Sequence, residues 1–246
     1  MSKMKFMNTE IDNLTLQETM QAIDQLIQED RSAYVVTPNV DHIVQLETNK
    51  ELQAVYENAS LILTDGKPLL WIAKWYGTPI KEKISGSDLF PLLCDMAAKK
   101  GYKMFFLGAA EGVAARAAEN LMNRFKGLQV VGTYSPPFGF EKNPVEMEKI
   151  KSMIKEANPH ILIVGLGCPK QEKFMYNHCK ELGVPVSFGL GASFDFEAGN
   201  IKRAPRWMSN HGLEWLFRIT QDPKRMAKRY LVDDRKIFGL AIKYRK

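Results

Sequence analysis

One stretch of the sequence, from Ile161 to Glu172, has residue types that could bind an anion. Four apolar residues are followed by Gly-Leu-Gly and then Cys-Pro-Lys-Gln-Glu, which predicts a buried strand, a glycine turn and a helix starting near Pro169. Free amide groups and the dipole at such a helix start favour a phosphate, and Lys170 and Gln171 add a charge and an amide. A tight turn without any ligand explains the same pattern, so both interpretations stay open.

The same stretch argues against a dinucleotide cofactor. It lacks the third glycine of the dinucleotide fingerprint, and Ser187 stands near the position where a ribose-binding acid is expected. A nucleotide-cofactor oxidoreductase is therefore kept only as an alternative function.

The whole chain alternates predicted strands with predicted helices, which indicates an α/β fold: a Rossmann-like, mostly parallel sheet with helices on both faces. Ligands of such sheets bind beyond the carboxyl ends of the strands, so polar residues and glycines at those ends are candidates. The candidates are Thr37, Asn39, Asp41, Asp65, Gly108, Gly165, Gly167, Gln171 and Asp195.

Asp65 is the most interesting of these candidates. A carboxylate at the mouth of a phosphate-binding cleft could act as a general base. The alternative is that Thr-Asp-Gly at 64–66 is only a good turn sequence.

Local signals place several helix boundaries. Thr15 and Glu18 form a predicted capping box, Ser87 is the expected cap of a helix that ends at Gly101, and Asp222-Pro223 opens a helix near the carboxyl end. The regular elements predict two parts, a catalytic body at 1–200 and a helical appendage at 201–246.

Composition predicts a soluble protein of the cytoplasm, since no apolar run approaches the length of a membrane span. The three cysteines lack metal or redox spacing, which favours reduced and mostly buried thiols. Asp195 and Glu197 resemble an acidic metal motif only weakly, and the four histidines form no ligand cluster in sequence, so we expect no metal and no cofactor.

The positive charge of the chain is concentrated in the appendage. Residues 201–246 hold 13 Lys or Arg against 4 Asp or Glu, whereas residues 1–200 carry a net −3. Aromatic residues are interleaved with these cations, which fits a solvated helix face, a nucleic-acid patch or a segment on an anionic membrane. The neutral-to-acidic body makes nucleic acid the weakest of the three.

Nine motifs, in order along the chain, resemble the WecG/TagA/CpsF family of bacterial glycosyltransferases. They are TPNVDHI (37–43), LTDG (63–66), GSDL (86–89), FFLG (105–108), YSPPFGF (134–140), GLGCPKQE (165–172), GASFDF (191–196), KRAP (202–205) and GLEWLFR (212–218). The resemblance implies inverting transfer of N-acetylmannosamine from its UDP derivative to undecaprenyl-diphosphate-linked N-acetylglucosamine. That step makes the linkage unit of wall teichoic acid.

The resemblance also implies roles for particular residues. Asp65 occupies the position of the base, and Thr37, Asn39 and Gln171 match sugar-contacting or pocket-lining positions. Diphosphate contacts are implied for Arg218, Arg225 and Lys228, in an appendage that packs over the site and reaches the membrane-embedded acceptor. Lys83 and Lys228 stand where the family usually has Arg, so the charge is kept and the bidentate fork is lost.

The family further implies a metal-independent enzyme bound peripherally at the inner face of the cell membrane, with self-association through the body. Related enzymes use UDP-N-acetylmannosaminuronic acid or UDP-glucose, and these donors stay open as alternatives. A non-catalytic RNA- or membrane-binding module is the remaining hypothesis.

Overall fold

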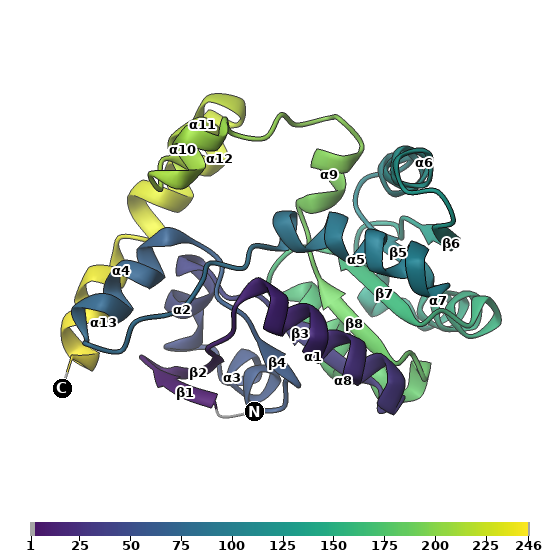
Figure 1. The fold of residues 1–246 in the computed structure, drawn as a ribbon, viewed down its shortest axis with the longest axis horizontal. Helices are drawn as coiled ribbons and strands as arrows, with labels where there is room; N and C mark the ends of the chain where they lie inside the picture. The colour runs from purple at the N-terminus through teal and green to yellow at the C-terminus, as the bar shows by residue number, and fades with distance from the viewer. Residues whose placement is uncertain (1–2, 246) are drawn as a thin grey trace.

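A computed structural model describes residues 3–245. Its centre is a six-stranded, all-parallel sheet in the order β4-β3-β8-β7-β5-β6 (Figure 1). The strands of this sheet are β3 (Ala33–Val36), β4 (Leu61–Ile62), β5 (Lys103–Gly108), β6 (Gln129–Tyr134), β7 (Ile161–Gly165) and β8 (Val186–Gly189). The predicted α/β class with a parallel sheet is confirmed.

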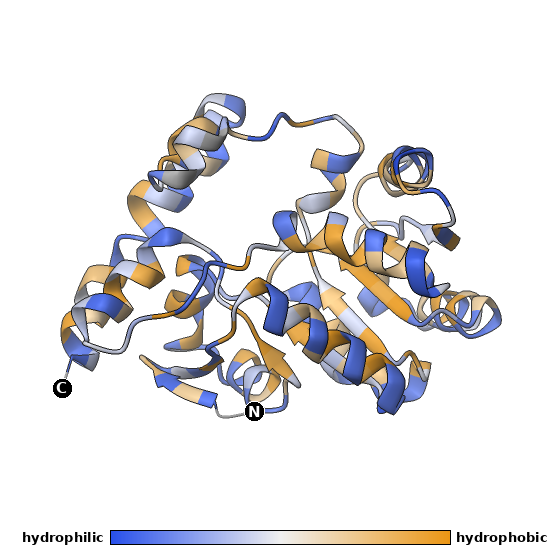
Figure 2. Cartoon of the chain, in the orientation of Figure 1, coloured by the Kyte–Doolittle hydropathy of each residue, from blue (hydrophilic) through white to orange (hydrophobic). Residues whose placement is uncertain are grey.

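Helices cover both faces of the sheet because its strands carry apolar side chains on both sides. In β7, Leu162 and Val164 enter one core cluster while Ile161 and Ile163 enter the other. Figure 2 shows these strands as a hydrophobic centre within more hydrophilic helices. The helices of the body are α1 (Leu16–Glu29), α2 (Val40–Leu46), α3 (Lys50–Glu57), α4 (Lys67–Trp75), α5 (Gly86–Lys100), α6 (Val113–Arg124), α7 (Pro144–Ala157), α8 (Lys170–Leu182) and α9 (Ser193–Glu197), with a short 3₁₀ turn η1 (Phe140–Lys142).

Most predicted helix boundaries lie within a few residues of the observed ones, and one cap is corrected. Ser85, not Ser87, caps α5: its hydroxyl accepts a hydrogen bond from the Asp88 amide at 3.2 Å. The predicted capping box of Thr15 and Glu18 on α1 is confirmed. Three features were not foreseen: the helix α2, the short helix α9, and the antiparallel hairpin of β1 (Lys3–Phe6) and β2 (Thr9–Asp12).

The carboxyl-terminal part of the chain is helical. It contains α10 (Arg206–Asn210), α11 (Glu214–Gln221), α12 (Pro223–Lys228), the π-helical turn η2 (Arg229–Asp233) and α13 (Lys236–Tyr244). In Figure 1, α10 to α12 form a group beyond α4, and α13 returns to lie beside α4 and α2. Ile237 and Ala241 of α13 are buried in a core cluster of the body, and the Tyr76 hydroxyl donates to the Ala241 carbonyl at 2.6 Å. The last helix is thus part of the body's packing.

No helix among residues 3–245 is both long enough and apolar enough to cross a membrane.

Candidate active site

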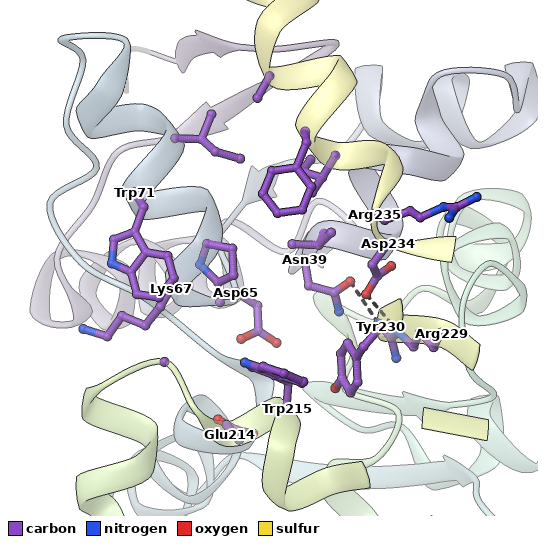
Figure 3. A pocket seen from close by; sticks show the side chains of 18 of the residues that line it. Asn39, Asp65, Lys67, Trp71, Glu214, Trp215, Arg229, Tyr230, Asp234 and Arg235 are labelled. Atoms are coloured by element: carbon purple, nitrogen blue, oxygen red, sulfur yellow. Dashed lines mark hydrogen bonds and ion pairs between the residues drawn. The ribbon is translucent and has the colours of Figure 1, made fainter. Parts of the chain in front are cut away.

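A cavity of about 730 Å³ lies between the end of β4, the helix α4 and the carboxyl-terminal helices (Figure 3). One end of it is polar and contains the residues that could do chemistry. The polar lining consists of Asn39, Asp65, Lys67, Lys83, Ser209, Glu214, Arg218, Arg229, Tyr230, Asp234 and Arg235. The other end is apolar and lies between α4 and α13.

Asp65 follows β4 and points into the cavity (Figure 3). Its amide donates to the Pro38 carbonyl at 2.8 Å, so the backbone here is fixed by the neighbouring strand end. Gly66, at φ 107°, then turns the chain into α4. Burial raises the pKa of Asp65 to about 6, although the positive charges of Lys83 and Arg218 oppose the increase. A carboxylate with that pKa is ionised at neutral pH and is a stronger base than an ordinary aspartate.

Cations line the cavity into which this carboxylate points. Lys67, Lys83, Arg218, Arg229 and Arg235 line the cavity, whereas its acidic lining residues are Asp65, Glu214 and Asp234. An excess of positive charge in a partly enclosed space favours a polyanionic ligand such as a diphosphate. The amino-terminal end of α4 opens on the same space at Gly66 and Lys67 without a side-chain cap, so the positive end of the helix dipole faces the cavity.

Two of the cations are oriented by neighbouring acids. Lys83 forms an ion pair with Asp88 at 3.0 Å, and its side chain is largely buried. Burial opposes the charged form of Lys83, but Asp88 and Asp65 raise its pKa overall, so the side chain stays charged. Arg218 donates from Nε and Nη2 to Glu214 at 3.1 and 2.7 Å.

Arg229 connects the carboxyl-terminal helices with the end of β3. Its Nη2 donates to Asn39 Oδ1 at 3.1 Å and lies 3.5 Å from the Asp41 carboxylate. Asp234 approaches the same guanidinium at 3.9 Å, and burial raises the pKa of Asp234 to about 6 despite that charge. Asn39 thereby contacts a residue 190 positions away while it also caps α2.

Behind Asn39, a buried polar network reaches the glycine turn of β7. His42 Nδ1 lies 2.9 Å from Asn39 Oδ1, and His42 Nε2 lies 3.3 Å from Glu172 Oε1. Gln171 donates to the same Glu172 oxygen at 2.8 Å and accepts from the Gly191 amide at 3.2 Å. Gln171 therefore fastens the segment after β8 and does not line the cavity.

The network also contains one cluster with metal-ligand chemistry. His42, Cys168 and Glu172 bring three potential ligand atoms within 4.8 Å of one another, a juxtaposition that the spacing of the histidines gave no reason to expect. Both ring nitrogens of His42 already have protein partners. Burial lowers the pKa of His42, but Cys168 and Glu172 raise it by more than burial lowers it. The net increase favours a charged imidazolium paired with Glu172.

The candidate glycines lie at the same edge of the sheet, and two of them are required by packing. A Cβ atom on Gly108 would lie 2.4 Å from the Gly165 carbonyl oxygen, and one on Gly165 would lie 2.4 Å from the Phe194 ring. Gly167, at φ 76°, turns the exposed start of α8. Since β4 and β7 are parallel and three strand spacings apart, about 14 Å separates Asp65 from this turn along the edge.

Several predicted site residues lie outside the cavity. Thr37 is buried between β3 and Asn39. Asp195 accepts a hydrogen bond from Asn200 at 3.2 Å. Arg225 is exposed and pairs with Asp222 at 2.7 Å, and Lys228 is exposed at the end of α12.

Sequence reasoning missed most of the cavity wall that the carboxyl-terminal helices supply. Arg229, Tyr230, Glu214 and Trp215 line the cavity, and the rings of Trp215 and Tyr230 meet edge to face at 6.2 Å. The interleaving of cations and aromatics in residues 201–246 was a usable signal, but it did not indicate which side chains turn inward.

Comparisons with known proteins identify the class to which this fold and site belong. A family model described as "Glycosyl transferase WecG/TagA/CpsF family" matches residues 4–246. A protein of Bacillus spizizenii (strain ATCC 23059 / NRRL B-14472 / W23) is 33% identical over 202 residues, which cover 82% of this chain and 76% of that protein. A protein of Bacillus subtilis (strain 168) is 31% identical over 206 residues, covering 84% of this chain and 77% of the relative. Both relatives are named N-acetylglucosaminyldiphosphoundecaprenol N-acetyl-beta-D-mannosaminyltransferase.

The protein is therefore an enzyme that transfers glycosyl groups. The chain belongs to the WecG/TagA/CpsF family of glycosyltransferases, as the nine sequence motifs predicted. This membership replaces the oxidoreductase and the non-catalytic module as interpretations of the fold.

Proposed function

We propose that this enzyme transfers N-acetylmannosamine, with inversion, from UDP-N-acetylmannosamine to N-acetylglucosaminyl-diphosphoundecaprenol. The names of its relatives state the transferred sugar and this acceptor for those proteins. The product is the linkage unit of wall teichoic acid. The observation that carries the proposal is Asp65, a carboxylate with a pKa of about 6 that points into a cavity lined by five cations.

Asp65 is the general base of the reaction. Its carboxylate takes the proton of the acceptor sugar hydroxyl while that oxygen attacks the anomeric carbon of the donor. The bond from the anomeric carbon to the diphosphate breaks, and UDP leaves with its bonding electron pair. Attack from the face opposite the leaving group inverts the anomeric centre.

The donor lies along the carboxyl edge of the sheet, with its diphosphate toward Gly165, Gly167 and Gly108 and its sugar toward Asp65. Support comes from the parallel order of β4, β3, β8 and β7, which places these positions on one edge. Thr37 and Asn39 follow the strand beside Asp65, and the buried network through His42 and Glu172 holds Asn39 against the glycine turn. Gln171 and Asp195 stabilise the loops behind the donor.

Protein cations, not a divalent ion, neutralise the charge that develops on the leaving diphosphate. Lys83 and Arg218 are the best candidates, because both line the cavity with Asp65 and their charges oppose the increase of its pKa. No cofactor is required by this chemistry.

The acceptor reaches the cavity from an anionic membrane surface. The exposed side chains of Lys224, Arg225 and Lys228 on α12 supply positive charge on the outer side of the carboxyl-terminal helices, where anionic lipid headgroups would lie. We propose peripheral attachment at the inner face of the cell membrane on this basis.

A transfer assay with a panel of UDP-sugars and a lipid-diphosphate N-acetylglucosamine acceptor tests the proposal. UDP-N-acetylmannosamine is expected to give the highest kcat/KM, and added EDTA is expected to leave the rate unchanged. Preference for UDP-N-acetylmannosaminuronic acid or UDP-glucose would reassign the donor, and a rate that collapses with EDTA and returns with Mg²⁺ or Mn²⁺ would overturn the metal-free mechanism.

A further inference from the structure

The cavity continues beyond its polar end into an apolar arm between α4 and α13. On α4, the side chains that line this arm recur three or four residues apart, as do those on α13, so each helix turns one apolar face to the arm. These residues are Pro68, Trp71, Ile72 and Trp75 on α4, and Ile237, Phe238, Ala241 and Ile242 on α13.

The arm has a buried floor and exposed apolar rims. Ile237 and Ala241 are each only 5% exposed, whereas Trp71 is 56%, Phe238 73% and Ile242 70% exposed. Large apolar side chains are seldom gathered in the open along a groove unless a ligand or partner covers them.

The arm is continuous with the cationic end of the same cavity. Lys67 at the start of α4 and Arg235 just before α13 line the polar end, and both helices run away from it side by side (Figures 1 and 3). At the far end, the Tyr76 hydroxyl joins the two helices through the Ala241 carbonyl. A ligand that fills the cavity must therefore have an anionic head and a hydrocarbon tail.

We infer that this arm binds the first isoprenoid units of the lipid-diphosphate acceptor, so that the protein, and not only the bilayer, holds the hydrocarbon next to the diphosphate. The inference rests on the proposed function and adds a binding subsite to it. The arm runs along the eight residues from Pro68 to Trp75, about 10 Å of helix, which limits the subsite to a few five-carbon units. The isoprenoid units further from the diphosphate stay in the membrane.

The affinity of this subsite should depend on the number of isoprenoid units in the ligand. Burial of each methylene raises affinity about fourfold, so each five-carbon unit that enters the arm should tighten binding at least tenfold. The gain should stop once the arm is full.

Calorimetric titration of the full chain with diphosphates, in the absence of vesicles and detergent, tests the inference. The probes are inorganic diphosphate and the one-, two-, three- and four-unit isoprenyl diphosphates, all below their micelle concentrations. The dissociation constant is expected to fall at least tenfold per unit over the first two units and then to level off. Equal dissociation constants for the one- and three-unit probes would overturn the inference and favour an apolar face that only enters the bilayer.

Two variants test whether binding of the isoprenyl probes depends on the arm or on exposed apolar residues in general. Phe238→Ser and Ile242→Ser change exposed rim residues, so the fold should tolerate them, and each should weaken the three-unit probe about tenfold while leaving inorganic diphosphate unchanged. Val232→Ser is the matched control, because Val232 is an exposed apolar residue of η2 that does not line the cavity. An equal loss in Val232→Ser, or no loss in either rim variant, would overturn the inference. Glycosyl transfer itself is measured separately with the donor panel, so failure of the subsite and failure of the transferase proposal give different results.

Discussion

The side chain of Arg229 donates a hydrogen bond to Asn39 at 3.1 Å and so joins the carboxyl-terminal helices to the end of a central strand. Asn39 lines the cavity together with Asp65, and Arg229 of the carboxyl-terminal helices lines the same cavity (Figure 3). The cavity that contains Asp65 is therefore complete only when residues beyond 201 are packed against the body.

Replacement of Arg229 by Met should damage both the site and the fold. The change removes the bond to Asn39 and leaves Asp234, which is buried, without its nearest cation. We expect kcat/KM for the acceptor to fall at least tenfold and the free energy of unfolding to fall by about 1 to 3 kcal/mol. Thermal unfolding and steady-state kinetics measure the two effects. Arg31→Met is the control, since Arg31 is an exposed arginine of the α1–β3 connection; a matching loss in the control would contradict the role of Arg229.

The rate of transfer should follow the ionisation of Asp65. Burial raises the pKa of this carboxyl to about 6, and only the deprotonated form accepts a proton. The logarithm of kcat/KM should therefore be flat above pH 7 and fall about tenfold per pH unit below 6. A profile that stays flat down to pH 4.5 would show that a different group is the base.

The same ionisation should affect stability with a defined sign. Because the pKa of Asp65 is higher in the folded protein than its ordinary value of 3.8, the folded state binds the proton more tightly. Asp65 therefore reduces stability above pH 6 and has no such effect below pH 4. At pH 7.5 the variant Asp65→Asn should unfold at a higher temperature than the native chain, because its free energy of unfolding should be larger by about 1 to 3 kcal/mol. This difference in the free energy of unfolding should become smaller as the pH falls to 4. A gap that is independent of pH would contradict this linkage.

Attachment to membranes should depend on the exposed cations of α12. Each such charge contributes about 1 kcal/mol of attraction to an anionic surface, so the triple variant of Lys224, Arg225 and Lys228 to Gln should bind vesicles about a hundredfold more weakly. Sedimentation with phosphatidylglycerol vesicles measures the change, and unchanged thermal unfolding shows that the fold is intact. A control variant with Lys99, Lys126 and Lys142 changed to Gln removes three exposed charges from the body. Equal loss in the control would show that net charge alone, and not α12, determines attachment.

The position of Asp65 was predictable because a single rule supplied it. Parallel strands present their carboxyl ends at one edge, and a polar residue directly after a buried apolar run must lie there. The same rule brought Asn39 and the glycine turn to that edge. The packing of Gly108 against Gly165 was not predictable, because it depends on which strands are neighbours.

The contribution of Arg229 could not be predicted from periodicity. The helix that opens at Pro223 ends at Lys228, and the next five residues form a π-helical turn that shifts the helix face. A regular helix gives no reason to choose Arg229 over Arg225 as the residue that turns inward. Family resemblance selected Arg225 and Lys228, which the structure places on the outer side.

The missed hairpin and the missed helix α2 have local explanations. Met7 adopts φ 50° in the turn between β1 and β2, without the glycine or asparagine that normally marks such a turn at that position. Asn39 caps α2 by accepting from the His42 amide, and His42 stands at the position where a capping box usually has Glu or Gln. Both elements use uncommon residues at positions where sequence rules expect common ones.

The variant Asp65→Asn tests the central claim most directly, through two measurements on one protein. UDP binding, measured by calorimetry, should stay within about threefold of the native value, because the amide has the same shape and Asp65 is not a diphosphate ligand. Transfer of N-acetylmannosamine to the lipid-diphosphate acceptor should fall at least a thousandfold, because an amide cannot accept the proton at neutral pH. Near-native turnover by this variant would contradict the assignment of Asp65 as the base and, with it, the mechanism proposed for the enzyme.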